Sequence, residues 1–243
     1  MRVMRFFLGL MFLITASGAY ATQHNEYNGE QIRAIVEHDL AKHEIGGVSV
    51  TVEHGVVTLR GVVRSAWEKS KAVEAALDVH DVTDVIDELT VRGAESDESL
   101  VEDVGRAIER YVFYGVFDAV GASVLDSKVT LQGWVSWSFK ASEIANHVSR
   151  ITGVKEVSNE IEVLPVSHFD DELRVRLAVA IYRDLPGLAN RAHPPIHIVV
   201  NSGRVILAGA VRNRVEKVRS EHIARSAFGV LSVDNQLRVD RSS

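Results

Sequence analysis

The order of apolar and polar residues predicts a regular succession of short elements along this chain. Apolar residues recur every three to four positions over 29–42, which is typical of a helix with one buried face. They alternate with polar residues over 48–53 and again over 56–60, so two strands joined by a hairpin are expected. A second helix is predicted over 66–77, and a last strand ends at Val91. The unit therefore has the order helix, strand, strand, helix, strand.

This unit occurs three times. Residues 61–91 align without a gap with 133–163 after a shift of 72 positions, and with 209–239 after a further 76. Apolar positions coincide along the alignment, and so does one glycine per copy: Gly61, Gly133 and Gly209. A glycine at one place in every copy indicates a backbone requirement, either a positive φ or a close approach of a neighbouring strand. The chain is therefore expected to consist of tandem copies of one module.

Each copy is predicted to be a small α+β module with the order αββαβ. A strand–helix–strand crossover normally gives a parallel pair, so each module should hold a three-stranded mixed sheet. Both helices should cover one face of that sheet, and the other face is either open or meets a neighbouring module. The predicted boundaries are 27–93, 95–165 and 168–241.

Short polar side chains predict where helices begin. Asn28 and Ser65 precede the two helices of the first module and can accept a hydrogen bond from a first-turn N–H. Either Ser96 or Asp97 can do the same in the second module. In the third module we expect Asp170 to start the first helix.

The N-terminal 21 residues have the pattern of a secretory signal peptide. A basic start is followed by the apolar run Phe6–Ile14 and by Ala19-Tyr20-Ala21, a small-x-small cleavage site. The run is too short to span a bilayer, and an uncleaved anchor is the alternative. The 243 residues include no cysteine, so neither a disulfide nor an acylated cysteine is expected. We therefore predict an exported protein, processed after Ala21, whose contact with a membrane is reversible.

Charge is distributed unevenly among the modules. The whole chain has a formal net charge of −6, which argues against general nucleic-acid binding. Residues 95–165 include 6 basic and 12 acidic residues, a net charge of −6, whereas 166–243 include 12 basic and 8 acidic residues, a net charge of +4. The third module, taken alone, is therefore suited to face an anionic surface.

The last part of each copy carries a recognisable motif. In the second copy, residues 153–163 are GVKEVSNEIEV, and the third copy keeps the glycine and the asparagine as Gly229 and Asn235. Together with the glycine after the hairpin, this pattern resembles the BON domain, in three tandem copies that cover essentially all of the chain after the signal peptide. The first copy departs from the pattern, with Asp81 for the glycine and Asp87 for the asparagine.

The resemblance implies a periplasmic, non-catalytic module. BON domains occur in osmotically inducible proteins and in outer-membrane-associated lipoproteins of Gram-negative bacteria, so the resemblance implies interaction with phospholipid or maintenance of the envelope. The departures in the first copy single it out as a structural spacer.

Basic residues gather around the second helix of the third module. A basic residue near an anionic leaflet contributes roughly 1 kcal/mol of binding free energy, so this group is the first candidate for a weak, salt-sensitive lipid contact. The alternative is a solvated face, because Glu221 lies four positions from both Lys217 and Arg225 and can form ion pairs with them. The candidates are Arg212, Arg214, Lys217, Arg219 and Arg225.

The second module is rich in aromatic residues. Trp137 aligns with Ser65 and Asn213, which are capping positions, so we expect it to be exposed and consider it a further candidate for lipid contact. Phe139 is expected to belong to the core. The acidic balance of this module argues against its docking on anionic lipid alone.

No pattern of residues predicts catalysis, a metal or a cofactor. His193 and His197 are four positions apart, but Pro194-Pro195 between them prevents the helix that would bring them together. Neither a His-Glu-x-x-His motif nor a Gly-x-Ser-x-Gly motif occurs. We therefore expect no metal, no cofactor and no enzymatic activity.

The sequence thus favours a periplasmic protein that binds anionic phospholipid weakly, in envelope maintenance or the response to osmotic stress. The alternative is a periplasmic protein–protein adaptor or stress holdase without direct lipid contact, in which hairpin edges and open sheet faces would bind partners. A structural spacer is a third possibility, and the oligomeric state is left open.

Overall fold

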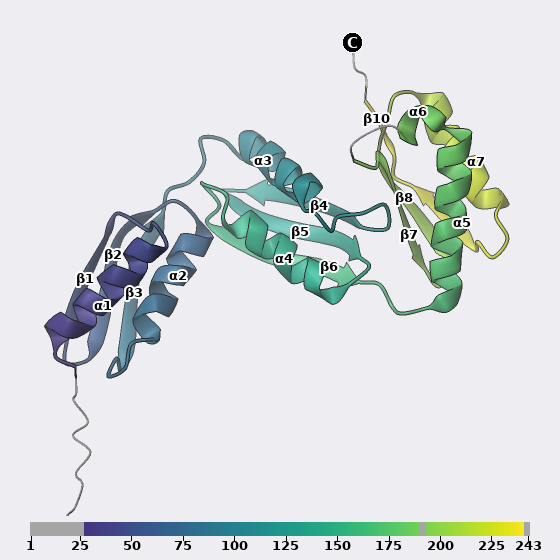
Figure 1. Cartoon of the computed structure of the whole chain (residues 1–243). Helices are drawn as coiled ribbons and strands as arrows, with labels where there is room; N and C mark the ends of the chain where they lie inside the picture. The colour runs from purple at the N-terminus through teal and green to yellow at the C-terminus, as the bar shows by residue number, and fades with distance from the viewer. Residues whose placement is uncertain (1–26, 190–192, 241–243) are drawn as a thin grey trace, which may run out of the picture.

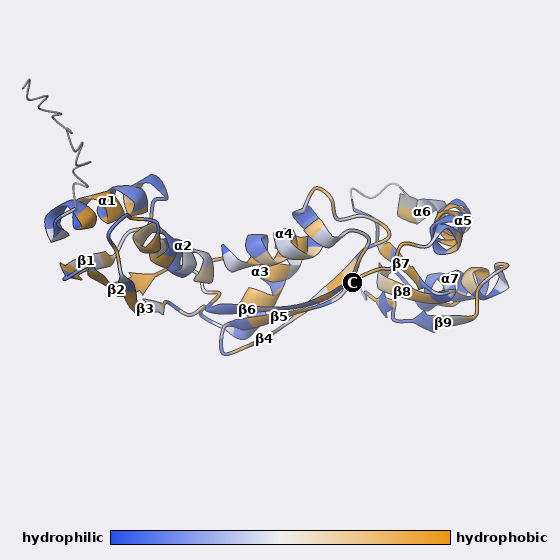
Figure 2. Ribbon diagram, turned by 90° about the horizontal axis from the view of Figure 1, so that it is seen from below, coloured by the Kyte–Doolittle hydropathy of each residue, from blue (hydrophilic) through white to orange (hydrophobic). Residues whose placement is uncertain are grey.

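The structure is a computed structural model of the chain, and it describes residues 27–189 and 193–240. The predicted signal peptide lies outside these residues. Three α+β modules follow one another in a row (Figures 1 and 2). Each has its own mixed sheet, with its two long helices on one face. The predicted α+β fold of three tandem modules is therefore confirmed.

The first module contains a three-stranded sheet in the order β1-β2-β3. β1 is antiparallel to β2, and β3 is parallel to β2 after the crossover through α2. Its elements are α1 (Gly29–Lys42), β1 (Val48–Glu53), β2 (Val56–Val63), α2 (Ala66–Leu77) and β3 (Asp84–Val91).

The second module repeats this topology with the same register. Lys128 pairs with Glu156 as Val56 pairs with Asp84, so the shift of 72 positions holds in space. Its elements are α3 (Asp97–Arg110), β4 (Ala119–Leu125), β5 (Lys128–Val135), α4 (Ser138–Ser149) and β6 (Glu156–Val163).

The third module differs in two places. A short helix, α6, follows the first long helix, and the last strand is divided into β9 and β10. The division occurs where the Asn235 side chain accepts a hydrogen bond from the Leu237 N–H at 3.2 Å. Its elements are α5 (His168–Asp184), α6 (Pro186–Ala189), β7 (Ile196–Asn201), β8 (Arg204–Val211), α7 (Arg214–Ser226), β9 (Ser232–Asn235) and β10 (Arg238–Val239).

The predicted helix starts are confirmed with one exception. Asn28, Ser65 and Ser96 each accept a hydrogen bond from a backbone N–H three residues later. The prediction for Asp170 is wrong, because α5 begins at His168 and is capped by Ser167. The buried Asp170 carboxylate instead accepts hydrogen bonds from the N–H groups of the next hairpin turn, at 2.8 and 2.9 Å.

The repeated glycines have one structural cause. Gly61, Gly133 and Gly209 have φ angles of +144°, +125° and +107°. A Cβ atom on any of them would lie 1.9 to 2.3 Å from a carbonyl oxygen of the neighbouring antiparallel strand segment. Any L side chain at this position would therefore clash with backbone and strain φ. The surroundings are alike in all three copies, as the repeat requires.

Each module closes around its own apolar core. The strand leucines Leu59, Leu131 and Leu207 occupy equivalent positions and are each 0% exposed. They pack with buried residues of the two helices in three separate clusters. Packing within each module is therefore the main source of stability, and the joints between modules add to it.

The first and second modules meet through two backbone hydrogen bonds. The Gly153 N–H donates to the Arg64 carbonyl, and the Ala66 N–H donates to the Val154 carbonyl, both at 2.8 Å. The Arg150 guanidinium lies over the Trp67 ring at 4.2 Å from its centroid. The turn between α4 and β6 thus docks on the corner between β2 and α2.

The second and third modules meet in a different way. The outer face of the third sheet is apolar at Val199 and Ile206, where the first module has the polar Thr51 and Thr58. Val199 is fully buried and packs in a cluster that includes Trp134 of the second module. The sequence prediction left two alternatives for the uncovered sheet face of each module, and in the third module that face meets a neighbouring module.

Candidate functional site

The buried face of the α7 helix consists of polar or small residues, and its outer face carries both apolar and charged residues. Asn213 caps it by accepting a hydrogen bond from the Glu216 N–H at 2.9 Å. Glu216, Ser220 and Ala224 recur every four residues and are buried against the module. Since 3.6 residues make one turn, the exposed residues gather on the opposite side: Arg214, Val215, Val218, Arg219, His222 and Arg225.

Three of the five predicted basic residues form ion pairs within the module. Arg212 pairs with Glu216 at 2.6 Å, and Arg225 pairs with Glu221 at 2.9 Å. Arg219 pairs with Asp184 of α5. These three arginine side chains are still 52 to 57% exposed. Exposed pairs of this kind contribute about 0 to 1 kcal/mol, so their guanidinium groups can rearrange toward another anion at little cost.

The other two basic residues behave differently from each other. Lys217 turns inward and donates to the Leu237 carbonyl at 2.6 Å, so it is not available at the outer face. Arg214 is exposed and makes no ion pair or side-chain hydrogen bond with any residue that the structure describes. Of the two ion pairs expected for Glu221, the structure contains the one with Arg225.

The pKa of the Glu221 carboxyl group is lowered in this environment. The largest cause is the hydrogen bond from the Asn235 side chain, and the second is the hydrogen bond from Arg225. Asn235 also donates to the Lys217 carbonyl at 3.0 Å, so it links the last strand to α7. The asparagine of the motif therefore holds the helix in place rather than facing solvent.

Exposed valines are the feature that the sequence prediction missed. Val215 and Val218 are 70 and 56% exposed, in the middle of the outer face of α7. Val175 and Val179 on the neighbouring α5 are 53 and 57% exposed, and α5 and α7 lie side by side (Figure 1). The alignment of the three modules contained a signal for Val218, because its equivalents in the other modules are the polar Ser70 and Ser142.

The two predicted aromatic positions have different outcomes. Trp137 is the N-cap residue of α4 and is 63% exposed. The prediction that Phe139 belongs to the core is wrong, because it is 43% exposed and contacts Phe113 edge-on at 5.8 Å between ring centroids. This helix position faces outward in the third module too, where it is Val215. Trp137 lies on the second module, and the five basic residues lie on or beside α7 of the third, so these candidates do not form one site.

The second module contains a buried charge pair. Lys140 donates to the Asp118 carboxylate at 2.7 Å, and their side chains are 10 and 1% exposed. The same carboxylate accepts hydrogen bonds from the Ser136 N–H and hydroxyl, each at 2.8 Å, and from the Gly115 N–H. All donors are internal to the module, so this pair holds the corner before α4 in place and offers no atom to a substrate.

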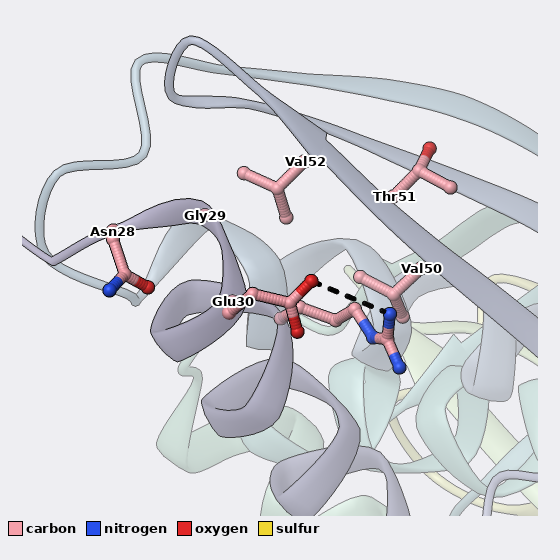
Figure 3. A pocket seen from close by; sticks show the side chains of 7 residues that line it. Asn28, Gly29, Glu30, Val50, Thr51 and Val52 are labelled. Atoms are coloured by element: carbon pink, nitrogen blue, oxygen red, sulfur yellow. Dashed lines mark ion pairs between the residues drawn. The ribbon is translucent and has the colours of Figure 1, made fainter.

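One hollow lies beside α1, between its first turn and β1 (Figure 3). It has a volume of about 390 Å³ and is lined by Asn28, Glu30, Arg33 and the strand segment 50–52. Glu30 and Arg33 face each other at 4.0 Å, and Asn28 is engaged in a capping box. The polar groups around this hollow are therefore directed at one another.

Among residues 27–189 and 193–240, no group of three or more His, Cys, Asp or Glu residues is placed to hold a metal ion. No helix in the same ranges is both long enough and apolar enough to cross a bilayer.

Comparison with known proteins identifies the class. The BON domain matches this chain three times, over residues 28–93, 96–165 and 174–241. The chain therefore belongs to the BON domain family.

Among individual proteins, the chain is similar to osmotically-inducible protein Y of Escherichia coli (strain K12). The two are 30% identical over 136 residues, which is 53% of this chain and 67% of the relative. Of solved structures, the C-terminal domain of CdsD, the structural protein of the type III secretion system of Chlamydia trachomatis, matches with 14% identity and a TM-score of 0.26, over 88% of this chain and 100% of that one. A TM-score this low supports no argument about this chain.

Proposed function

We propose that this chain is a non-catalytic periplasmic protein that makes weak, reversible contact with anionic phospholipid through the outer face of α7. Membership of the BON domain family and similarity to an osmotically inducible protein support a role in envelope maintenance or the response to osmotic stress. The observation that carries the lipid part is the pairing of exposed valines with arginines on one helix face.

The arrangement suits an interfacial helix. Val215 and Val218 lie at the centre of the face on either side of His222, Arg214 and Arg225 lie along one side of it, and Arg219 lies along the other. Such a helix places its apolar centre among the acyl chains while its cationic flanks contact headgroups.

The expected affinity is low. Each arginine contributes roughly 1 kcal/mol near an anionic leaflet, and burial of each exposed valine contributes on the order of 1 kcal/mol. The sum is small, and its electrostatic part weakens as salt screens the charges. Contact should therefore be reversible and depend on anionic lipid and on ionic strength.

Flotation with lipid vesicles tests this proposal. The mature chain should float with vesicles that contain phosphatidylglycerol at low salt, and not with vesicles of phosphatidylcholine alone. Val215→Ser with Val218→Ser should weaken retention several-fold, and so should the combined change of Arg214, Arg219 and Arg225 to Gln.

A matched control keeps the change in net charge and moves it to other modules. Arg33, Arg106 and Lys128 are exposed cations of the first two modules, and each is ion-paired as Arg219 and Arg225 are. Their combined change to Gln should leave retention close to that of the wild type. If no vesicle composition retains the protein at low salt, the lipid proposal is wrong, and crosslinking to envelope proteins would then test the adaptor alternative.

A further inference from the structure

The turn between the second helix and the last strand is a docking element in the second module. Its Gly153 has a φ of +96°, and the turn is closed by a hydrogen bond from the Val154 N–H to the Ile151 carbonyl at 3.1 Å. This conformation presents the Gly153 N–H and the Val154 carbonyl to the first module, where both are paired as described above.

The third module has the same turn in the same conformation. Gly229 has a φ of +95°, and the Val230 N–H donates to the Ala227 carbonyl at 3.3 Å. The Leu231 N–H donates to the Gly203 carbonyl at 2.8 Å, as the Lys155 N–H donates to the Ser127 carbonyl at 2.9 Å in the second module. The two turns are therefore interchangeable in backbone geometry.

The turn of the third module is not docked. The Gly229 N–H and the Val230 carbonyl make no hydrogen bond with any residue described by the structure. Phe228 and Leu231 are 84 and 77% exposed. The docked turn has Thr152 and Lys155 at these positions, so the free turn is much the more apolar of the two. Large apolar side chains exposed beside unpaired backbone groups are typical of a contact surface.

A matching corner is open on the second module. The docked corner of the first module offers the Arg64 carbonyl and the Ala66 N–H. The equivalent Ser136 carbonyl and Ser138 N–H make no hydrogen bond within the described part of the chain. The corner is bordered by Trp137 and Phe139, which are 63 and 43% exposed.

The corner of the third module is a poorer acceptor. It has Arg214 where the docked corner of the first module has Ala66, and this charge would lose water under an apolar turn. Charge also favours the second module, because residues 95–165 have a net charge of −6 and residues 166–243 a net charge of +4. An intermolecular contact between these two modules is therefore attractive at long range.

We propose that the chain associates head to tail with a second copy of itself, and that this contact repeats the joint seen between its first two modules. The 228–231 turn of one copy docks on the corner at 136–138 of the next. The Gly229 N–H donates to the Ser136 carbonyl, the Ser138 N–H donates to the Val230 carbonyl, and Phe228 and Leu231 pack on Trp137 and Phe139. Such a contact is heterologous, so it generates short open chains or rings rather than a closed dimer.

Sedimentation velocity of the mature chain in lipid-free buffer, over a wide range of concentrations, tests this inference. The wild type should associate, so that its sedimentation coefficient rises with protein concentration. Phe228→Thr with Leu231→Lys gives the free turn residues similar to those of the docked one and should leave a monomer. Trp137→Ser with Phe139→Ser should have the same effect. Val175→Ser with Val179→Ser, on exposed positions of α5, is the matched control and should associate as the wild type does.

Mixing the turn variant with the corner variant is the decisive experiment. The turn variant keeps an intact corner, and the corner variant keeps an intact turn, so an equimolar mixture should form a one-to-one dimer that grows no further. A wild type that stays monomeric at every concentration would overturn the inference, as would association that survives either variant or a mixture that stays monomeric. Because no lipid is present, these results are independent of the proposed membrane contact.

Discussion

The second module and its two neighbours hold the same corner in place with different residues. In the first and third modules, Glu68 and Glu216 are buried, and each accepts a hydrogen bond from the backbone N–H of an arginine four residues earlier, at 2.7 and 2.9 Å. In the second module the equivalent residue is Lys140, and the carboxylate comes from Asp118. The corner therefore requires a carboxylate at one point in space, and the chain supplies it from two different positions.

This difference shows that the fold requires a carboxylate at one place in each module, but does not require that it come from the same position in the sequence. The alignment of Glu68, Lys140 and Glu216 reverses charge at a buried position, which would destabilise a module with nothing to compensate. In the second module Asp118 compensates for this reversal. It lies directly before β4, where the first module has Gly46.

Loss of the Asp118 carboxylate should have the largest effect. Asp118→Ala leaves the buried Lys140 ammonium without its carboxylate partner and the Ser136 N–H without an acceptor, which should lower the free energy of unfolding by about 3 to 5 kcal/mol. Urea unfolding followed by tryptophan fluorescence measures this, since Trp134 and Trp137 both belong to the second module. An effect below about 1 kcal/mol would show that the pair does not hold the corner in place.

Substitution of the three repeated glycines should show that the modules are alike at this position. Gly133→Ala places a Cβ 2.0 Å from the Ala119 carbonyl oxygen at a φ of +125°. Strain of this kind costs on the order of 1 to 3 kcal/mol. Gly61→Ala and Gly209→Ala should cost similar amounts in the same unfolding assay. A neutral result in one module and a large one in another would break the structural repeat.

Moving the first module's arrangement into the second should have a small effect. Asp118→Gly, Ser136→Arg and Lys140→Glu together restore a buried glutamate with its arginine, so stability should stay within about 1.5 kcal/mol of the wild type. Lys140→Glu alone places a second carboxylate against Asp118 and should be far more destabilising. If the triple variant is as unstable as this single variant, the two arrangements are not equivalent.

Acid should weaken the joint between the second and third modules, with the smallest effect. Burial lowers the pKa of His197 below its ordinary 6.5, although its hydrogen bond to the Gly115 carbonyl and the charge of Asp118 oppose this. The unfolded chain therefore binds a proton more readily than the folded chain. Stability from this group is fully present above about pH 6.5 and is lost as the pH falls below that value. The wild type should unfold at a lower temperature at pH 5.5 than at pH 7.5, and this difference should be smaller in His197→Gln. The same difference in both proteins would contradict a role for His197.

The architecture could be predicted because its signals are local and repeated. Alternation over β1 and β2, the glycine near the end of β2 and the apolar face of α1 recur in every copy, so each supports the others. The Asp118–Lys140 pair could not be predicted, because its members are 22 residues apart and no periodic pattern links them. The two modules that do use a glutamate have it four residues after its arginine.

The candidate site was predicted only in part for the same reason. The positive charge around α7 can be read from composition, but whether a given cation faces outward depends on contacts with distant residues, such as Lys217 with Leu237. Phe139 was assigned to the core because it aligns with Trp67 and Val215, whereas its place in the first turn of α4 faces solvent. The apolar residues of the outer sheet face, such as Val199, gain their meaning only from the neighbouring module.

The central functional claim is that contact with anionic lipid takes place on α7 and not on the equivalent helices of the other modules. Hydrogen–deuterium exchange of the mature chain with and without phosphatidylglycerol vesicles tests it directly. We expect slower exchange in peptides from 214–226, with unchanged exchange in 66–77 and 138–149. Equal protection of all three helices, or protection of α2 or α4 without α7, would contradict the account.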